Sequence, residues 1–302
     1  MKILILMSTY NGEKYIKEQL DSIFINTTFQ PNLLIRDDGS NDGTTDIIED
    51  YKKRNPQLKI DLKKEKNIGF AKSFMQLISL AEEKYDFFFF ADQDDYWERG
   101  KLENATKFLE SCKEIPALYF SKTEYVDSKL NHLGFSPTYP KHLIGFRNAI
   151  VQNIATGCTI ALNKKSIQLL KSSMPEALIA HDWWCYLVIS AFGKIFYDEN
   201  SHIKYRQHEN NTIGINTSII KRNFKRFNRF FKKNRFPISK QLEIFSTCYG
   251  SKLEKENSEI LKAITGKNRL YKIYRILIKN SPTRSSKLDN LLLSITILLN
   301  KF

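Results

Sequence analysis

The chain has 302 residues, of which 42% are hydrophobic, and this is enough for a substantial core in one large domain or in one domain with an extension. The formal net charge of +14 favours an anionic partner, either a nucleic acid, a phosphorylated small molecule or a membrane surface. The four cysteines form no CxxC pair, which argues against a zinc site and a disulfide framework, and no apolar run is long enough to span a bilayer. The N-terminal apolar run is too short for a signal peptide. We therefore expect a cytoplasmic protein in a reducing compartment.

The first hundred residues alternate short apolar runs with helical patterns. Strands are expected over 2–8, 32–38, 58–65 and 86–92, and helices over 12–26, 43–55 and 69–85. This alternation predicts an α/β fold with a mostly parallel sheet that is flanked by helices on both faces. The run "FFFF" at 87–90 is typical of a strand that is buried on both faces.

The alternation loosens after residue 116. Strands are expected over 117–127, 156–164, 194–199 and 202–208, and helices over 166–174 and 181–193. From about residue 215 the pattern is helical and very basic, and the chain ends in a short apolar segment at 287–302. We expect one domain over 1–212, with two halves over 1–100 and 101–212, followed by a basic helical region over 213–302.

Four polar motifs fall at or near strand ends in the first half. They are "STYNG", "RDDGS", "KNIGF" and "ADQDD". Ligands of open parallel sheets bind outside the carboxyl ends of the strands, so the four motifs should converge on one edge of the sheet.

The motif "ADQDD" places three carboxylates within four positions. Asp92 and Asp94 are two residues apart, so in an extended chain they would face the same ligand. Close carboxylates repel each other and raise each other's pKa, and a hard divalent cation such as magnesium or manganese removes that repulsion. The alternative is an acidic turn in which Asp95 caps the next helix.

The motif "RDDGSNDGT" has two interpretations. Asp37 and Asp38 follow a strand, where a carboxylate can accept hydrogen bonds from a base or a ribose. Equally, the glycines permit a tight turn, and Asp42 or Thr44 would cap the following helix without any further function.

In order and spacing, the four motifs resemble the nucleotide-binding half of the family 2 glycosyltransferases, which have the GT-A fold. The resemblance covers roughly residues 1–210 and implies a nucleotide-sugar donor, a divalent metal and transfer with inversion at the anomeric carbon. Thr9 and Tyr10 would line the base pocket, Asp38 would contact the pyrimidine, and Asp92 would lie on the ribose side. Asp94 would be the metal ligand of the Asp-x-Asp motif. The resemblance adds further donor-binding residues: Asn11, Asn67, Gly69, Lys72 and Gln93.

Transfer to a hydroxyl also needs a base within hydrogen-bond reach. The candidate is Asp182 in "AHDWWCYLV", where family 2 enzymes carry an acidic residue that opens a helix. Many members have Glu-Asp there, so His181 is a departure while Asp182 keeps the role. His181 would contact the acceptor, and Trp183 and Trp184 would form a platform for the apolar face of an acceptor sugar. The alternative is a helix N-cap followed by two core tryptophans. By the resemblance, residues 1–100 are the nucleotide-binding half and residues 101–212 the acceptor half of a catalytic domain.

Two further segments complete the predicted site. In "TGCTI", Gly157 and Cys158 would allow close approach of the acceptor, although a buried strand explains them equally well. In "YRQHENN", Arg206 would pair with phosphate, and His208 would be a third metal ligand, a phosphate contact or a solvated loop residue. Together, "HDWW" and "YRQH" resemble the subgroup of bacterial surface-polysaccharide rhamnosyltransferases, which implies dTDP-L-rhamnose as donor. A UDP-hexose is the alternative donor.

The basic tail carries eight Lys and Arg residues over 221–235, interleaved with four phenylalanines. It would either pack on the catalytic domain, lie on an anionic membrane at the inner face of the cell membrane, or bind nucleic acid. We disfavour the last because no stacking motif accompanies the charge. A membrane location would suit a lipid-linked saccharide acceptor, and the apolar end would complete a membrane-facing or oligomer-forming surface.

Two other functions fit parts of the pattern. Nucleotidyl transfer also uses paired carboxylates and a metal, but the loop after the first strand lacks the glycine- and basic-rich phosphate-binding sequence of that class. A non-catalytic basic membrane adaptor on a degenerate transferase fold is the remaining alternative.

Overall fold

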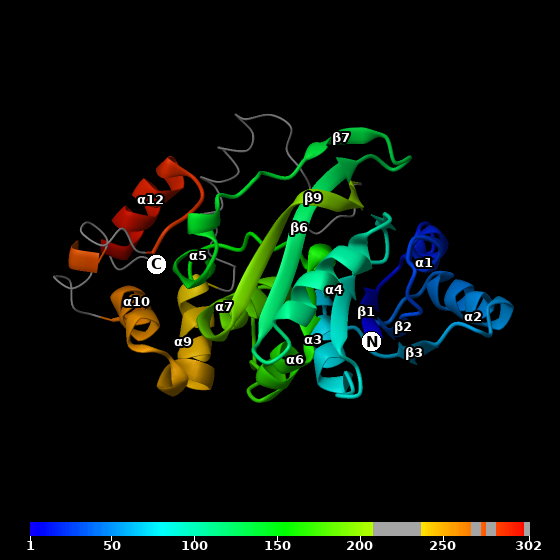
Figure 1. Cartoon of the computed structure of the whole chain (residues 1–302), viewed down its shortest axis with the longest axis horizontal. Coiled ribbons are helices and arrows are strands. Elements are labelled where there is room, and N and C mark those ends of the chain that lie inside the picture. The colour runs from blue at the N-terminus through cyan, green and yellow to red at the C-terminus, as the bar shows by residue number, and fades with distance from the viewer. Residues whose placement is uncertain (208–236, 267–272, 276–281, 299–302) are drawn as a thin grey trace.

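The computed structural model describes residues 1–207, 237–266, 273–275 and 282–298 (Figure 1). The described residues form one sheet of nine strands: β1 (Ile3–Thr9), β2 (Asn32–Asp37), β3 (Ile60–Lys64), β4 (Phe87–Ala91), β5 (Tyr96–Trp97), β6 (Ala117–Val126), β7 (His132–Phe135), β8 (Ala161–Asn163) and β9 (Lys194–Arg206). The order across the sheet is β3-β2-β1-β4-β8-β6-β9-β5, and β7 pairs with β6.

The first half of the sheet is parallel throughout. β1 pairs in parallel with both β2 and β4, and β2 pairs in parallel with β3. β8 runs antiparallel to its neighbours β4 and β6, whereas β6 and β9 are parallel to each other. The prediction of a mostly parallel α/β sheet is confirmed, and the carboxyl ends of β1, β2 and β4 lie side by side.

Helices cover both faces of this sheet. They are α1 (Ile16–Ile25), α2 (Thr44–Arg54), α3 (Phe70–Leu80), α4 (Lys101–Ser111), α5 (Phe146–Ala149), α6 (Lys164–Lys171), α7 (His181–Phe192), α9 (Ile238–Tyr249), α10 (Lys255–Thr265) and α12 (Lys287–Leu298). Short 3₁₀ turns occur at η1 (Lys141–Leu143), η2 (Gly157–Thr159) and η3 (Gly250–Lys252).

Strand β4 shows how the sequence builds two cores. Phe87 and Phe89 point into the core that β1 and β2 form with α1, α2 and α4. Phe88 and Phe90 point into the opposite core, which contains α3, α6 and α7. All four phenylalanines are buried, which confirms the prediction from "FFFF" and leaves the acidic motif at the open end of a central strand.

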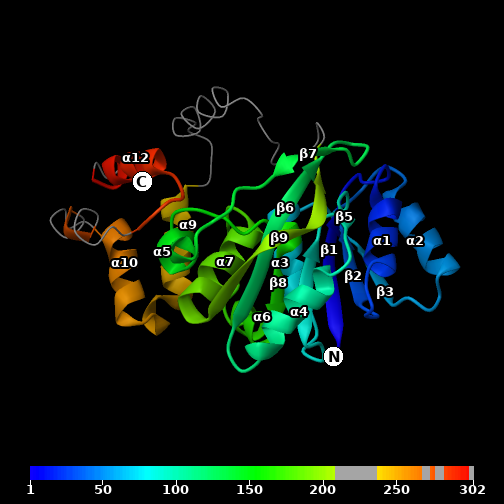
Figure 2. The ribbon, with the colours of Figure 1, turned by 45° about the horizontal axis from the view of Figure 1, so that its top comes forward.

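The described C-terminal helices share the second of these cores. Phe245 and Tyr249 of α9 and Ile260 of α10 are buried against residues of α5 and α7. In Figures 1 and 2, α9, α10 and α12 lie beside α5 and α7, at the end of the molecule farthest from α2. Hydrogen bonds from Asn148 to the main-chain oxygen of Thr283 and from Gln152 to Ser285 add polar contacts to this interface. The described part of the region after residue 213 therefore packs on the catalytic fold.

One expectation about the second half changes. Residues 194–206, expected as parts of two strands, form a single strand, β9, whose pairing with β6 shifts register twice. The basic segment 218–236 and His208 lie outside the described residues. No helix in the described ranges is long and apolar enough to cross a membrane.

Candidate active site

The ends of β1 and β2 are joined by short polar contacts. The Thr9 hydroxyl donates to Asp37 over 2.9 Å, and the main-chain N–H of Asp38 donates to the Thr9 oxygen over 2.7 Å. The Asp37 carboxylate also accepts hydrogen bonds from the main-chain N–H and the hydroxyl of Ser40. Asp37 therefore shapes the turn after β2, as the simpler interpretation of "RDDGS" expects.

Asp38 is bonded within the protein. Its carboxylate forms an ion pair with Arg36 at 2.5 Å and accepts hydrogen bonds from the main-chain N–H groups of Ile68 and Gly69 at 2.8 and 2.9 Å. Gly69 has a positive φ of 83°, which favours glycine, at the point where the chain enters α3. Asp38 thus holds the "NIGF" loop against the end of β2, and its contact with a pyrimidine stays a prediction.

The loop after β1 faces the motif after β4. The side-chain amide of Gln93 pairs with the main-chain N–H and oxygen of Tyr10, at 2.8 and 3.0 Å. Tyr10 itself is 47% exposed, and Asn67, Gly69 and Lys72 are also exposed. These residues remain open to a ligand, in keeping with the predicted donor contacts. Asn11 is also exposed, but it bonds to the turn after β2: its side-chain oxygen accepts the Asn41 N–H, and its main-chain N–H donates to the Ser40 hydroxyl oxygen.

The acidic motif forms a compact buried cluster. Ligand atoms of Asp92, Asp95 and Cys158 lie within 4.8 Å of one another. Burial, together with the charges of Asp94 and Asp182, raises the pKa of Asp92 to about 7. Burial and the neighbouring aspartates also raise the pKa of Asp95 well above its usual range. Negative charge is therefore concentrated in this cluster, and a bound cation would reduce the repulsion between the carboxylates.

One cation of the protein itself lies beneath the cluster. Lys101 is buried at the start of α4, and its ammonium group donates to the main-chain oxygen of Cys158 over 2.7 Å and lies 4.6 Å from the ring centre of Trp97. Burial lowers the pKa of Lys101 to about 8, while Asp95 and Asp92 oppose that shift. A single lysine in an amphipathic helix pattern looks solvent-exposed in sequence, so nothing in the pattern distinguished Lys101.

Two predictions about this loop are corrected. Asp95 does not cap α4: the residue before α4 is Gly100, and Asp95 accepts the main-chain N–H of Arg206 at 3.2 Å. Arg206 is 1% exposed, and its guanidinium donates to the main-chain oxygens of Asp94 (2.8 Å) and Ser128 (2.6 Å) and to Glu18. Arg206 therefore anchors the acidic loop from behind instead of pairing with a phosphate.

Asp182 lies in the first turn of α7 and is buried. Its carboxylate accepts the main-chain N–H of Trp183 at 2.6 Å, and Asn153 and the main-chain N–H of Gly157 also bond to it. Burial outweighs these hydrogen bonds and raises the pKa of Asp182 to about 6. Its charge reaches Asp92 strongly enough to raise the pKa of that residue, so the structure brings the predicted base and the acidic motif together.

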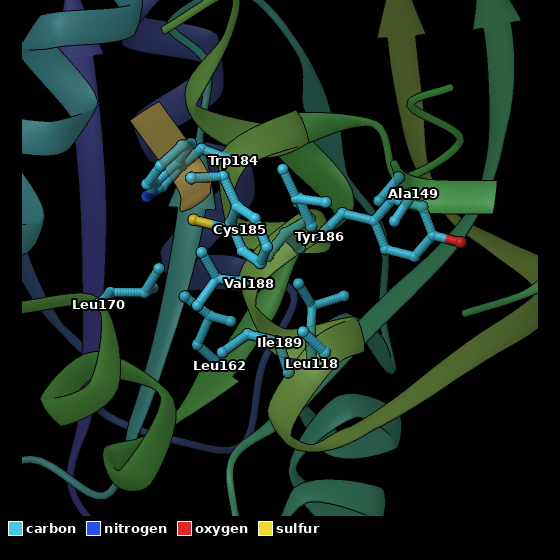
Figure 3. Packing of buried hydrophobic residues seen from close by; sticks show 14 of the residues in the cluster. Leu118, Ala149, Leu162, Leu170, Trp184, Cys185, Tyr186, Val188 and Ile189 are labelled. Carbon is cyan, nitrogen blue, oxygen red and sulfur yellow. The ribbon is translucent and has the colours of Figure 1, made fainter. Parts of the chain in front are cut away.

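Four predicted acceptor contacts are corrected because the residues are buried. Trp184 is fully buried in the core around α7, against Phe245 and Tyr249 (Figure 3). His181 stacks on Phe74 with ring centres 3.9 Å apart, and burial lowers its pKa to about 3. Gly157 and Cys158 are likewise buried.

Packing inside the protein explains the glycine at position 157. A Cβ there would lie 3.0 Å from the His181 ring, so glycine lets η2 approach α7 closely. Trp183 is the half-buried member of the predicted acceptor set, and its ring nitrogen donates to the main-chain oxygen of Ala149 at 2.6 Å.

Comparison with known proteins agrees with this architecture. The model of Glycosyl transferase family 2 matches residues 4–170. The chain is a member of glycosyltransferase family 2. It is 30% identical over 255 residues to "dTDP-rhamnosyl transferase RfbG" of Shigella flexneri, covering 78% of this chain and 84% of that protein. It is thus a glycosyltransferase with a GT-A fold.

Solved structures share the fold at low sequence identity. Staphylococcus aureus TarS in complex with UDP-GlcNAc matches with a TM-score of 0.59 at 18% identity, over all of this chain and 81% of that one. The mannosyltransferase PcManGT from Pyrobaculum calidifontis, in complex with GDP-Man and Mn²⁺, matches with a TM-score of 0.50 at 16% identity, over all of this chain and 88% of that one.

Proposed function

We propose that this protein transfers L-rhamnose from dTDP-L-rhamnose to a saccharide acceptor during surface polysaccharide assembly, with inversion at the anomeric carbon. The observation that carries the proposal is the buried Asp182 carboxylate, which lies near enough to the acidic motif at the end of β4 for its charge to raise the pKa of Asp92. The relative named as a dTDP-rhamnosyl transferase supports the choice of donor. A UDP-hexose is the second candidate donor.

In the proposed reaction Asp182 is the general base. Its carboxylate takes the proton of the acceptor hydroxyl while the hydroxyl oxygen attacks the anomeric carbon. The bond from that carbon to the diphosphate oxygen breaks, and its electron pair leaves with the nucleoside diphosphate. A pKa of about 6 suits this role, because the carboxylate is charged at neutral pH yet remains basic enough to accept a proton.

We further propose that the acidic motif holds a divalent metal, either Mn²⁺ or Mg²⁺. The residues fit such an ion: carboxylate oxygens gather at one strand end, burial and the neighbouring negative charges raise the pKa of Asp92, and one buried oxygen of Asp95 lacks a hydrogen bond. Asp94 would be the principal ligand, with Asp92 beside it. A bound metal would supply Lewis-acid stabilisation of the leaving diphosphate. His208 would be a third ligand of this metal or a contact of the donor phosphate.

Charge distribution supports association with an anionic membrane surface. Residues 213–302 hold 20 of the 47 Lys and Arg residues but five of the 33 Asp and Glu residues, so the rest of the chain is close to neutral. A region this basic is attracted to anionic headgroups, which would bring the site to a lipid-linked acceptor. The chain should sediment with vesicles of anionic lipid and not with phosphatidylcholine vesicles, and equal sedimentation with both would contradict a charge-driven contact.

A donor panel tests the proposed reaction. With Mn²⁺ present, dTDP-L-rhamnose should stabilise the protein against heating more than UDP-sugars do, and an acceptor saccharide should release dTDP. Release of pyrophosphate would identify nucleotidyl transfer instead. Failure of every nucleotide to bind would favour the non-catalytic adaptor.

A further inference from the structure

The middle residue of the acidic motif contacts the loop after β1, which lies 83 residues earlier in the chain. The Gln93 side-chain oxygen accepts the Tyr10 N–H at 2.8 Å, and the Gln93 side-chain nitrogen donates to the Tyr10 oxygen at 3.0 Å. Both polar groups of one main-chain residue are thus paired with one amide. The two bonds also fix the orientation of that amide, because the reversed orientation would place donor against donor.

Gly12 is shaped to receive this amide. A Cβ at position 12 would lie 2.3 Å from the Gln93 oxygen and 2.5 Å from its Cδ, which is closer than atoms approach without a bond. On its other side the same loop is fixed to the turn after β2, where the Gly12 N–H donates to Thr44 at 2.7 Å. The loop is therefore held between the acidic motif and the β2 turn.

Gln93 lies between two aspartates of the acidic motif in the sequence. Its neighbour Asp92 lies in the cluster with Asp95 and Cys158, and its other neighbour Asp94 is held through its main-chain oxygen by Arg206. One side chain thus links the acidic motif to the main chain of Tyr10. Tyr10 is 47% exposed at the same end of the sheet.

We propose that Gln93 is a positioning residue that couples occupancy of the metal site to binding of the nucleotide base. The proposal rests on the function proposed above, in which Tyr10 contacts the base and Asp94 the metal. A cation that orders the acidic motif would order the Tyr10 loop through the Gln93 amide. Each ligand would then tighten the binding of the other by the same factor.

An amide is the group that this contact requires. Alanine at 93 removes both bonds, and glutamate keeps an acceptor for the Tyr10 N–H but offers no donor to the Tyr10 oxygen. The Tyr10 groups are exposed enough for water to replace the lost partners, so the cost to folding should be small. Gln93→Ala and Gln93→Glu should therefore fold and can be tested as purified full-length chains.

The experiment measures the dissociation constant of dTDP by calorimetry, with Mn²⁺ and in its absence. The readout is the factor by which Mn²⁺ tightens dTDP binding. In Gln93→Ala and Gln93→Glu this factor should fall about fivefold or more, within the usual range of coupling between two sites. Gly12→Ala should lower it as well, because the added methyl displaces the Gln93 amide. Gln168→Ala, which removes a half-buried glutamine on α6, is the matched control.

If Gln93 had only a general structural role, the dissociation constants of the variants would change in a different way. If the variants weaken dTDP equally with and without Mn²⁺, or keep the wild-type factor, the coupling does not run through Gln93. If the wild-type protein binds neither dTDP nor UDP in the presence of Mn²⁺, the proposed function fails, and this inference fails with it. Wild-type binding combined with an unchanged factor in the variants overturns the inference alone.

Discussion

Lys101 donates a 2.7 Å hydrogen bond from its ammonium group to the main-chain oxygen of Cys158, beneath the acidic cluster. That contact joins α4 to η2, and the preceding residue of η2, Gly157, bonds through its N–H to the Asp182 carboxylate. The cluster and the proposed base are therefore supported by the same turn. The predictions below follow from contacts of this kind.

Replacing Lys101 by methionine should lower the free energy of unfolding by about 2–4 kcal/mol, because the buried carboxylates lose a neighbouring cation and the Cys158 oxygen loses its donor. Chemical denaturation at pH 7 measures the change. Lys107→Met, at an exposed position of the same helix, is the control and should change stability by less than about 0.5 kcal/mol. Equal effects of the two substitutions would show that Lys101 does not compensate the cluster.

Arg206→Lys should lower kcat/KM at least about tenfold while leaving the fold intact. Lysine keeps the positive charge, but it cannot reach the Asp94 oxygen, the Ser128 oxygen and Glu18 together. Steady-state kinetics measure the loss, and Arg99→Lys, at an exposed position between β5 and α4, should have little effect. Wild-type kcat/KM in Arg206→Lys would mean that the acidic loop does not depend on this anchor.

The pH dependence of transfer should follow Asp182. A base with a pKa of about 6 is active when deprotonated, so kcat/KM should rise with pH through about 6 and level off above 7. Asp182→Asn should remove both the activity and this limb of the profile. A flat profile between pH 5 and pH 8 in the wild-type enzyme would contradict the assignment.

The same carboxylate should make the folded protein less stable at high pH. Because its folded pKa lies above the ordinary value of 3.8, its contribution to stability is fully present below about pH 4 and is lost as the pH rises through about 6. Asp182→Asn should therefore be more stable than wild type by about 3 kcal/mol at pH 8 and equal to it near pH 4. Denaturation of both proteins at the two pH values measures this difference, with Glu110→Gln as an exposed control.

The two neighbouring tryptophans should behave differently. Trp184→Ala leaves a cavity in the core around α7 and should cost about 3–5 kcal/mol of stability. Trp183→Ala, at a half-buried position, should cost less and should raise the KM for the acceptor. A raised acceptor KM in Trp184→Phe, with Trp183→Phe unchanged, would reverse the roles assigned here.

The sequence predicts β1 to β4 and the helices between them within a few residues. Strands β1, β2 and β4 contain continuous apolar runs, β3 alternates apolar and charged residues, and a helical pattern follows each of the first three. The convergence of Thr9, Asp38 and Asp92 also follows from sequence, because parallel strands end at one edge. The ion pair of Arg36 has a sequence signal that the motifs do not use. Arg36 is a charge inside an apolar strand, and a buried charge needs a partner, which here is Asp38.

Other features depend on contacts between distant segments. The partners of Arg206 include Glu18 and Ser128, so its burial cannot be read from "YRQH". Trp184 and Trp183 are adjacent and chemically identical, and only the packing of α9 on α7 decides which one is buried. The double contact of Gln93 with Tyr10 likewise requires the fold to bring two loops together.

The central claim is that Asp182 is the base of an inverting glycosyl transfer. The most direct test follows dTDP release and the product's anomeric configuration by NMR, with dTDP-L-rhamnose, Mn²⁺ and an acceptor saccharide, for wild type and Asp182→Asn. The wild-type enzyme should form the glycoside with inverted configuration, and Asp182→Asn should bind dTDP as tightly while transferring at less than about 1% of the wild-type rate. Retained configuration, or wild-type transfer by Asp182→Asn, would contradict the claim.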